Sequence, residues 1–142
     1  MINQIFVNLA VKDLQSSVDF FTKLGFTFNP KFTDEKATCM VIGENIFAML
    51  LVESFFHTFT KKEIANTAES VEVLNALSTD SREKVDELVD KAIEAGGKEP
   101  RAAQEYPWMY GRAFEDLDGH TWEVFFMDMS KMPENPGMEA SA

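Results

Sequence analysis

The sequence contains one cysteine, Cys39, among its 142 residues, so no disulfide can form within the chain. A single thiol is typical of proteins in a reducing compartment, and we therefore expect a cytoplasmic location. Cys39 lies in the apolar run from Thr38 to Ile42. An inert thiol in the core is the expected role there, rather than a nucleophile.

Long apolar runs are also missing, because no stretch approaches the ~20 residues that a membrane-spanning helix needs. The first residues, MINQIFVNLAV, have neither a basic segment nor a cleavage site, so we do not expect a signal peptide. Basic residues are few: 13 Lys and Arg stand against 24 Asp and Glu, which gives a net charge of -11. An acidic surface repels phosphate groups, so we expect neither nucleic acid nor an anionic membrane as a partner.

Apolar and aromatic residues are plentiful. Hydrophobic residues make up 45% of the chain and aromatic residues 12%, with 13 Phe. This length and composition are typical of one globular domain with a substantial core.

The two halves of the chain show the same order of patterns. In the first half, the alternation from Ile5 to Val11 predicts a strand, and Asp13 caps a helix that ends at Gly25. In the second half, a strand over Val71–Thr79 precedes a helix that begins at Asp80 or Ser81 and ends at Gly96.

Three further strands follow the helix in each half. In the first half they are predicted at Phe26–Phe32, Ala37–Ile42 and Ile46–Val52, and in the second half at Lys98–Ala103, Trp108–Glu115 and Thr121–Met127. The first strand of each set contains a proline and is expected at a sheet edge. Each half therefore reads strand, helix, strand, strand, strand, which indicates an internal duplication.

These patterns divide residues 1–128, a single domain, into module one (1–53), a connector (54–70) and module two (71–128). Residues 129–142 are expected to form a loose tail. The connector is rich in Phe, for which core packing is the default, with a lid or a subunit contact as alternatives. Thr60 is predicted to cap a short helix through Ala65.

Glu123 stands in the middle of the most apolar strand of the chain. Both faces of that strand are otherwise apolar or aromatic, which suggests that Glu123 is buried and needs a partner or a function. Arg112 and Lys98 are possible partners. The alternative is a carboxylate that faces solvent at a sheet edge.

Several of these segments resemble the vicinal oxygen chelate superfamily. They are Val7–Leu14 with Phe20, Phe21 and Leu24–Phe26 in the first half, and Ala76–Asp80 and Phe114–Glu123 in the second. The last segment is similar to the closing hairpin of that superfamily, F-x-D-P-D-G-x-x-x-E. The superfamily contains glyoxalase I enzymes, extradiol dioxygenases, fosfomycin-inactivating enzymes and bleomycin-resistance binding proteins.

The resemblance implies an α+β fold of two tandem βαβββ modules whose sheets curl into a cleft, and a homodimer. In the metal enzymes of the superfamily, four His, Gln or Glu side chains in the cleft hold a divalent metal. Those four positions fall on Phe6, Leu50, Leu74 and Glu123 of this sequence. Because three of them are apolar, the resemblance implies no metal site and no cofactor here, with a divalent metal as the alternative.

The two histidines, His57 and His120, lie in a loop and a turn, and both are expected to be loop or surface residues rather than ligands.

The inward face would then form an apolar pocket with a few polar groups, which is the usual form of a small-molecule site. Phe6, Leu50 and Leu74 are its expected apolar residues, and Asn8 and Glu123 its polar ones. Tyr110 is a further candidate because a buried hydroxyl needs a partner. Trp108 and Met109 are assigned to the core, with the pocket as the alternative.

Three functions remain open. The first is a binding protein for a small, largely apolar molecule. The second is a glyoxalase-type lyase or dioxygenase, which uses either a metal or Glu123 as a general base. The third is an interaction protein that retains the fold without its chemistry.

Overall fold

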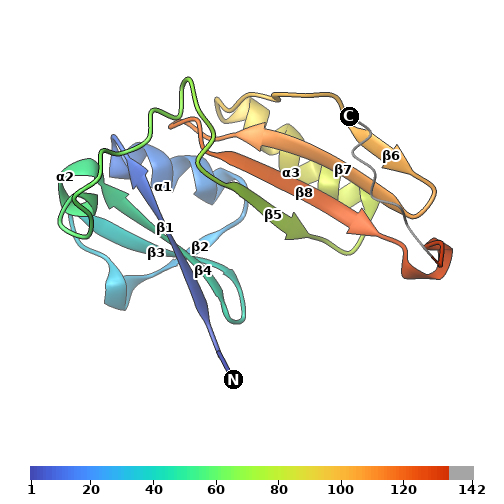
Figure 1. Cartoon of the computed structure of the whole chain (residues 1–142), viewed down its shortest axis with the longest axis horizontal. Helices are drawn as coiled ribbons and strands as arrows, with labels where there is room; N and C mark the ends of the chain where they lie inside the picture. The colour runs from blue at the N-terminus through green and yellow to red at the C-terminus, as the bar shows by residue number, and fades with distance from the viewer. Residues whose placement is uncertain (135–142) are drawn as a thin grey trace.

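The computed structural model describes residues 1–134 of the chain. They form two four-stranded mixed sheets that lie side by side (Figure 1), each with one long helix against one face. Module one contains β1 (Ile5–Val11), α1 (Leu14–Lys23), β2 (Thr27–Asn29), the 3-10 turn η1 (Pro30–Phe32), β3 (Ala37–Gly43) and β4 (Ile46–Val52). Module two contains β5 (Leu74–Ser78), α3 (Arg82–Glu94), β6 (Gln104–Tyr106), β7 (Met109–Glu115) and β8 (Thr121–Met127).

The two sheets have the same topology, which confirms the predicted α+β fold of tandem βαβββ modules. Their strand orders are β1-β4-β3-β2 and β5-β8-β7-β6. In each sheet the first strand pairs in parallel with the last strand of its module, and the other pairs are antiparallel. The sheets do not close into a barrel within the described residues, so β1 and β5 are edges.

Local capping explains where both long helices begin and end. Asp13 Oδ1 accepts a hydrogen bond from Ser16 N at 3.0 Å. At α3 the cap is Ser81, whose hydroxyl oxygen accepts from Lys84 N at 3.2 Å. Gly25 and Gly96 follow the helices with φ of 102° and 109°, a conformation that glycine adopts without strain.

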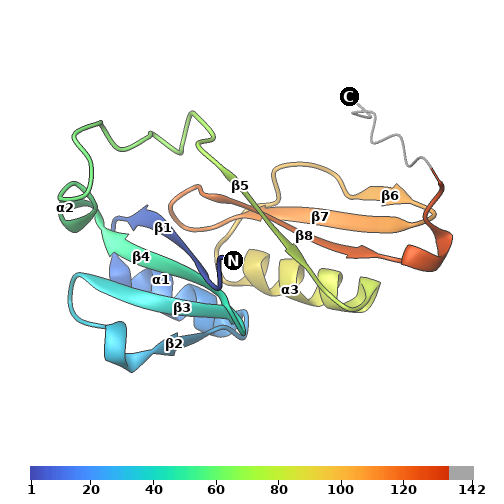
Figure 2. The ribbon, with the colours of Figure 1, turned by 60° about the horizontal axis from the view of Figure 1, so that its bottom comes forward.

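One hydrophobic core joins the two modules. Phe20 and Phe21 of α1 contact Phe114 of β7 and Trp122 of β8, with ring centroids 6.2 Å and 5.5 Å apart, respectively. The helices α1 and α3 lie behind the sheets in the view of Figure 1, and Figure 2 shows the same arrangement from another side. The opposite face of each sheet is therefore free of long helices, and we call it the open face.

Two predicted elements near prolines differ from the structure. The predicted strand over Phe26–Phe32 ends at Asn29, because Asn29 Oδ1 accepts from Lys31 N at 3.0 Å and starts the turn η1. The predicted strand over Lys98–Ala103 is wrong: only Lys98 pairs, in an isolated bridge with Glu115, and β6 begins at Gln104.

The predicted helix from Thr60 to Ala65 is also wrong, since the connector helix is α2 (Glu53–Phe56). In the predicted tail, Met129–Lys131 form the 3-10 turn η2, which Asp128 caps. Residues 135–142 lie outside the described residues. In the described part of the chain, no helix has the length and apolar character that crossing a bilayer requires.

Candidate functional site

Strand pairing places Glu123 on the open face of module two. Its partners across the sheet are Ala76 in β5 and Ala113 in β7. Residues that pair across neighbouring strands share a face, and so do residues two positions apart along a strand. Phe125 and its partner Gly111 therefore lie on the same face as Glu123.

A pocket of about 260 Å³ lies over this face. Its walls are mainly apolar, and Arg101 and Glu123 lie together among them. The apolar and small lining residues that matter below are Ala76, Met109, Gly111, Phe125 and Met127. Because Gly111 has no side chain, the floor of the pocket is open there: a Cβ at this position would lie 3.4 Å from both Phe125 Cβ and Met109 Sδ.

The charged partner of Glu123 is Arg101, from the loop between α3 and β6. Arg101 Nη2 donates to Glu123 Oε2 at 2.8 Å, and the two side chains are 33% and 29% exposed. Neither partner considered from the sequence holds this position. Arg112 points to the helix face, where it binds Asp86, and Lys98 forms a backbone bridge with Glu115.

This ion pair leaves hydrogen-bonding capacity free. Arg101 Nη1 has only a long contact of 3.5 Å to the carbonyl oxygen of Ala102. Glu123 Oε1 has no hydrogen-bond partner among the described residues, where its side chain bonds only through Oε2. The pocket wall therefore presents N–H donors and a carboxylate oxygen next to each other.

Phe6 and Asn8 lie on the open face of module one. Phe6 stacks on Phe47 of β4 with the ring centroids 4.7 Å apart. Asn8 borders a second cavity of about 390 Å³, to which the connector contributes Phe56 and Ile64. These two predicted residues thus share a face with each other, and the cavity that Asn8 lines is separate from the pocket of Glu123.

The predicted position Leu50 is wrong by one residue. Leu50 is fully buried in the core between the sheet and α1, whereas Met49 lies on the open face opposite Asn8. The internal duplication also places Met49 at the position that corresponds to Glu123. Met49 of β4 pairs with Asn8 of β1, and Glu123 of β8 pairs with Ala76 at the equivalent place in β5. Leu74 does lie on the open face of module two, 54% exposed at the start of β5 and outside the pocket lining.

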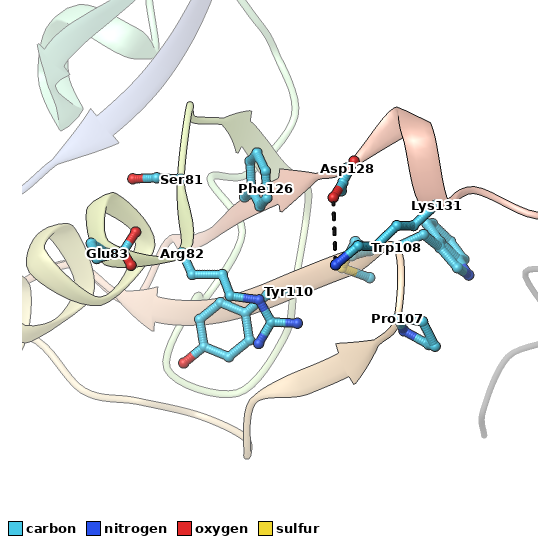
Figure 3. Close-up of a pocket in the computed structure, with 10 residues that line it drawn as sticks. Ser81, Arg82, Glu83, Pro107, Trp108, Tyr110, Phe126, Asp128 and Lys131 are labelled. Carbon is cyan, nitrogen blue, oxygen red and sulfur yellow. Dashed lines mark ion pairs between the residues drawn. The ribbon is translucent and has the colours of Figure 1, made fainter.

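Tyr110 lies on the helix face of β7, away from Glu123. Its hydroxyl donates to Asp86 Oδ1 of α3 at 2.6 Å, and the guanidinium carbon of Arg82 lies 5.0 Å from its ring centroid. Figure 3 shows Tyr110 beside Arg82 in a separate pocket of about 310 Å³. Trp108 is 5% exposed, as its assignment to the core predicts, but it and the half-buried Met109 also line both pockets, as the alternative assignment predicts.

Three of the four charged residues that line the pocket around Tyr110 already form ion pairs. Arg82 Nη1 lies 2.6 Å from Glu105 Oε1, and Lys131 Nζ lies 3.9 Å from Asp128 Oδ2, the pair dashed in Figure 3. The hydrogen bond from Tyr110, helped by Arg112, lowers the pKa of Asp86, and the same bond raises the pKa of Tyr110. These groups stabilise α3 against the sheet.

His120 is a structural residue that the sequence analysis placed wrongly at the surface. It is 3% exposed, with Nε2 2.7 Å from the carbonyl oxygen of Ala10 and Nδ1 3.2 Å from Glu72 Oε2. It ties the β7–β8 turn to β1 and to the segment before β5. The sequence offers no local signal for this role, because a histidine beside an Asp-Gly turn is normally exposed. The other histidine, His57, is exposed at the end of α2.

The residues at the four ligand positions do not suit a divalent metal. On the observed register these positions hold Phe6, Met49, Leu74 and Glu123, of which only Glu123 has a hard oxygen ligand. A guanidinium nitrogen already lies 2.8 Å from that carboxylate. Among residues 1–134, no three His, Cys, Asp or Glu side chains cluster as a metal site requires.

Two βαβββ modules with paired helices and open sheets define a glyoxalase-like α+β protein. The sequence pattern of the Glyoxalase/Bleomycin resistance protein/Dioxygenase superfamily matches residues 2–124, and the chain belongs to this superfamily.

Solved structures agree with this assignment. The hypothetical protein SA1046 from S. aureus is 32% identical, with a TM-score of 0.75 over 89% of this chain and 95% of that chain. A superfamily enzyme from Burkholderia phytofirmans PsJN is 17% identical, with a TM-score of 0.73 over 86% and 96%. The fosfomycin resistance protein FosX from Mesorhizobium loti is 15% identical, with a TM-score of 0.67 over 92% and 98%. No curated protein matches the chain.

Proposed function

We propose that this protein binds a small, largely apolar molecule in the pocket on the open face of module two. The observation that supports this most is the lining of that pocket, which is mainly apolar and surrounds the ion pair Arg101–Glu123. Small-molecule sites combine an apolar wall with a few fixed polar groups in this way. A volume of about 260 Å³ suits a small ligand of up to three aromatic rings.

A second candidate is a glyoxalase-type lyase or dioxygenase, or a metal-free enzyme in which Glu123 acts as general base. The observation in its favour is that Glu123 keeps its place in the closing hairpin and has one free oxygen, Oε1. We favour binding because Glu123 Oε2 already accepts a hydrogen bond from Arg101 Nη2 at 2.8 Å, and the pocket that surrounds the pair is mainly apolar. An interaction protein without chemistry is the third candidate.

We further propose that no divalent metal takes part, and we predict that the purified protein carries none. The apolar side chains of Phe6, Met49 and Leu74 support this. Metal analysis should find no stoichiometric Zn, Ni, Mn or Fe. A chelator should leave the melting temperature unchanged, since only a ligand lost from the native state would lower it. One metal per chain that disappears in Glu123→Gln would instead support the metal-dependent enzyme.

We also propose a homodimer. Large apolar side chains are exposed along the edge strands and next to them: Ile5, Phe6, Ile46, Val71 and Leu74 are between 45% and 62% exposed. Exposed apolar edges are normally covered by a partner chain. Cytoplasmic location and the absence of nucleic-acid and membrane partners remain expectations from the composition.

Filling the pocket tests the proposed binding site. Gly111→Val should be tolerated by the fold, because a Cβ there meets only ordinary contacts of 3.4 Å and valine suits a strand. The added methyl groups should occupy the floor between Met109 and Phe125. We expect the affinity for the neutral probe N-phenyl-1-naphthylamine, measured by its fluorescence increase, to fall about tenfold or more, ~1.4 kcal/mol.

Ser78→Val is the control, since it places the same valine side chain on the open face opposite Phe125 but outside the pocket lining. Its affinity for the probe should equal that of the wild type. Wild-type protein that fails to bind the probe, or an equal affinity in Gly111→Val, would contradict the proposed site. Circular dichroism melting curves establish that both variants fold.

A further inference from the structure

We propose that the Arg101–Glu123 pair makes the pocket selective for neutral ligands that carry a hydrogen-bond acceptor and a donor side by side. A primary carboxamide has this arrangement. The inference rests on the proposed binding function and adds the polar group that the ligand presents. The preference for a neutral ligand follows from the geometry of the Arg101–Glu123 pair and from its balanced charge.

The pair is balanced in charge. Arg101 contributes one positive charge and Glu123 one negative charge, 2.8 Å apart and each about two-thirds shielded from solvent. Among the ion pairs of the described residues, Glu123 has no second cation within 4.0 Å and Arg101 has no second anion. A charged ligand would therefore meet one attractive and one repulsive group at similar range, and would lose its hydration shell with little compensation.

The free hydrogen-bonding positions of the pair are complementary to each other. Arg101 has N–H groups that no strong acceptor occupies, and Glu123 Oε1 is an unpaired acceptor. An amide oxygen can accept from Arg101 while an amide N–H donates to Glu123 Oε1. A carboxylate has no proton for Glu123, and an ammonium group has no acceptor for Arg101.

The rest of the pocket lining does not change the charge balance of the Arg101–Glu123 pair. Apart from Arg112, the remaining lining around the pair is apolar or uncharged and includes Ala76, Gln104, Met109 and Phe125. The side chain of Arg112 is engaged by Asp86, Asp90 and Glu99 on the helix face. The ion pair is thus the main electrostatic feature that a ligand meets.

Three probes with the same ring system test the proposal: 2-naphthamide, 2-naphthoate and 2-naphthylmethylammonium. Their affinities for the intact protein are measured by isothermal titration calorimetry at pH 7. We expect wild-type protein to bind the amide at least about tenfold more tightly than either ion. Measurements at low and high salt separate this local preference from the net charge of -11, which salt screens at long range.

Single substitutions should shift the preference in opposite directions. Glu123→Gln leaves Arg101 unpaired, so 2-naphthoate should become the tightest of the three probes. Arg101→Gln leaves Glu123 unpaired, so 2-naphthylmethylammonium should become the tightest. The control Arg82→Gln removes an arginine of the same module outside this pocket, and it should keep the wild-type order. Arg101→Met and Glu123→Ala replace any glutamine variant that fails to fold.

The outcomes separate the two proposals. An order of affinities that is the same in wild type, Glu123→Gln and Arg101→Gln would overturn this inference, while binding of N-phenyl-1-naphthylamine would leave the proposed function standing. Tighter binding of either ion than of the amide by wild-type protein would also overturn it. Wild-type protein that binds neither the neutral fluorescent probe nor any naphthyl compound would overturn the proposed function itself.

Discussion

Asp116 and Glu123 belong to the same closing hairpin, and their surroundings give them different tasks. Asp116 is 7% exposed and accepts N–H groups of Asp118, His120 and Trp122, the last at 2.9 Å. Burial raises the pKa of Asp116, while His120 and these donors oppose the rise. All its bonds lie within the fold, so Asp116 is structural. Glu123 faces a pocket, shares one cation and keeps one oxygen free.

Tyr110 and Asp86 provide a prediction at the scale of single residues. Tyr110→Phe removes the hydrogen bond that chiefly lowers the pKa of Asp86, so this pKa should rise toward its ordinary value. The variant should lose roughly 1 kcal/mol of unfolding free energy at pH 7, a modest value because the Asp86 side chain is 48% exposed.

The stability difference should depend on pH in one direction. An acid with a lowered pKa in the folded state contributes stability above its unfolded pKa, and the contribution is lost as pH falls through the folded value. The gap between Tyr110→Phe and wild type should therefore be present at neutral pH and shrink below about pH 4, near the ordinary aspartate pKa of 3.8. Urea denaturation at several pH values and a carboxyl NMR titration of Asp86 measure both effects. A gap that widens in acid would contradict this assignment.

At the scale of elements, β4 shows how a shift of one residue along a strand decides whether a side chain is buried in the core or lies on the open face. Leu50 faces α1 with no exposed surface, and its neighbour Met49 is half-buried on the open face. Leu50→Glu should place a carboxylate in the core and cost about 4 kcal/mol or more, enough to unfold a marginal domain. Met49→Glu should fold with a loss of about 1 kcal/mol, since the side chain can reach water.

Thermal melting by circular dichroism of the two variants measures this contrast directly. Met49→Glu is a matched control for Leu50→Glu, because it adds the same charge one position away. Similar melting temperatures for the two variants would mean that the register of β4 against β1 is not the one described here.

At the scale of elements the fold was largely predictable from the sequence, because the signals for most helices and strands lie within the elements themselves. Alternating side chains identified β1 and β8 with the observed bounds, and the capping residues Asp13 and Ser81 identified the starts of α1 and α3. The connector was not predictable, because its helix α2 has no side-chain cap and depends on packing against β1 and β4.

At the scale of the whole molecule, the exposed apolar edges give the dimer prediction. Light scattering coupled to size exclusion should show two chains per particle at micromolar concentration. Ile5→Lys places a charge on the edge strand β1, where the wild-type side chain is 55% exposed, so the folded monomer should tolerate it. We expect this variant to be monomeric with an unchanged far-ultraviolet spectrum.

Lys36→Ala is a suitable control for the dimer experiment, since it changes one charge in the exposed turn before β3. It should leave the molecular mass of the particle unchanged. A wild-type protein that elutes as a clean monomer at micromolar concentration would refute the dimer, and an unchanged dimer in Ile5→Lys would place the interface away from β1.

The sequence by itself determined the duplicated βαβββ plan, the superfamily and the apolar character of the ligand positions. The plan rests on periodicity and on caps and turns. The superfamily and its ligand positions rest on the resemblance of short segments of the sequence, and neighbours along the chain suffice for all of these. Only the tertiary structure decided that Arg101 is the partner of Glu123, that Tyr110 faces α3, and that His120 is buried against Ala10. Those contacts join residues 22, 24 and 110 positions apart, so they depend on how loops and sheets pack in space, which no local pattern encodes.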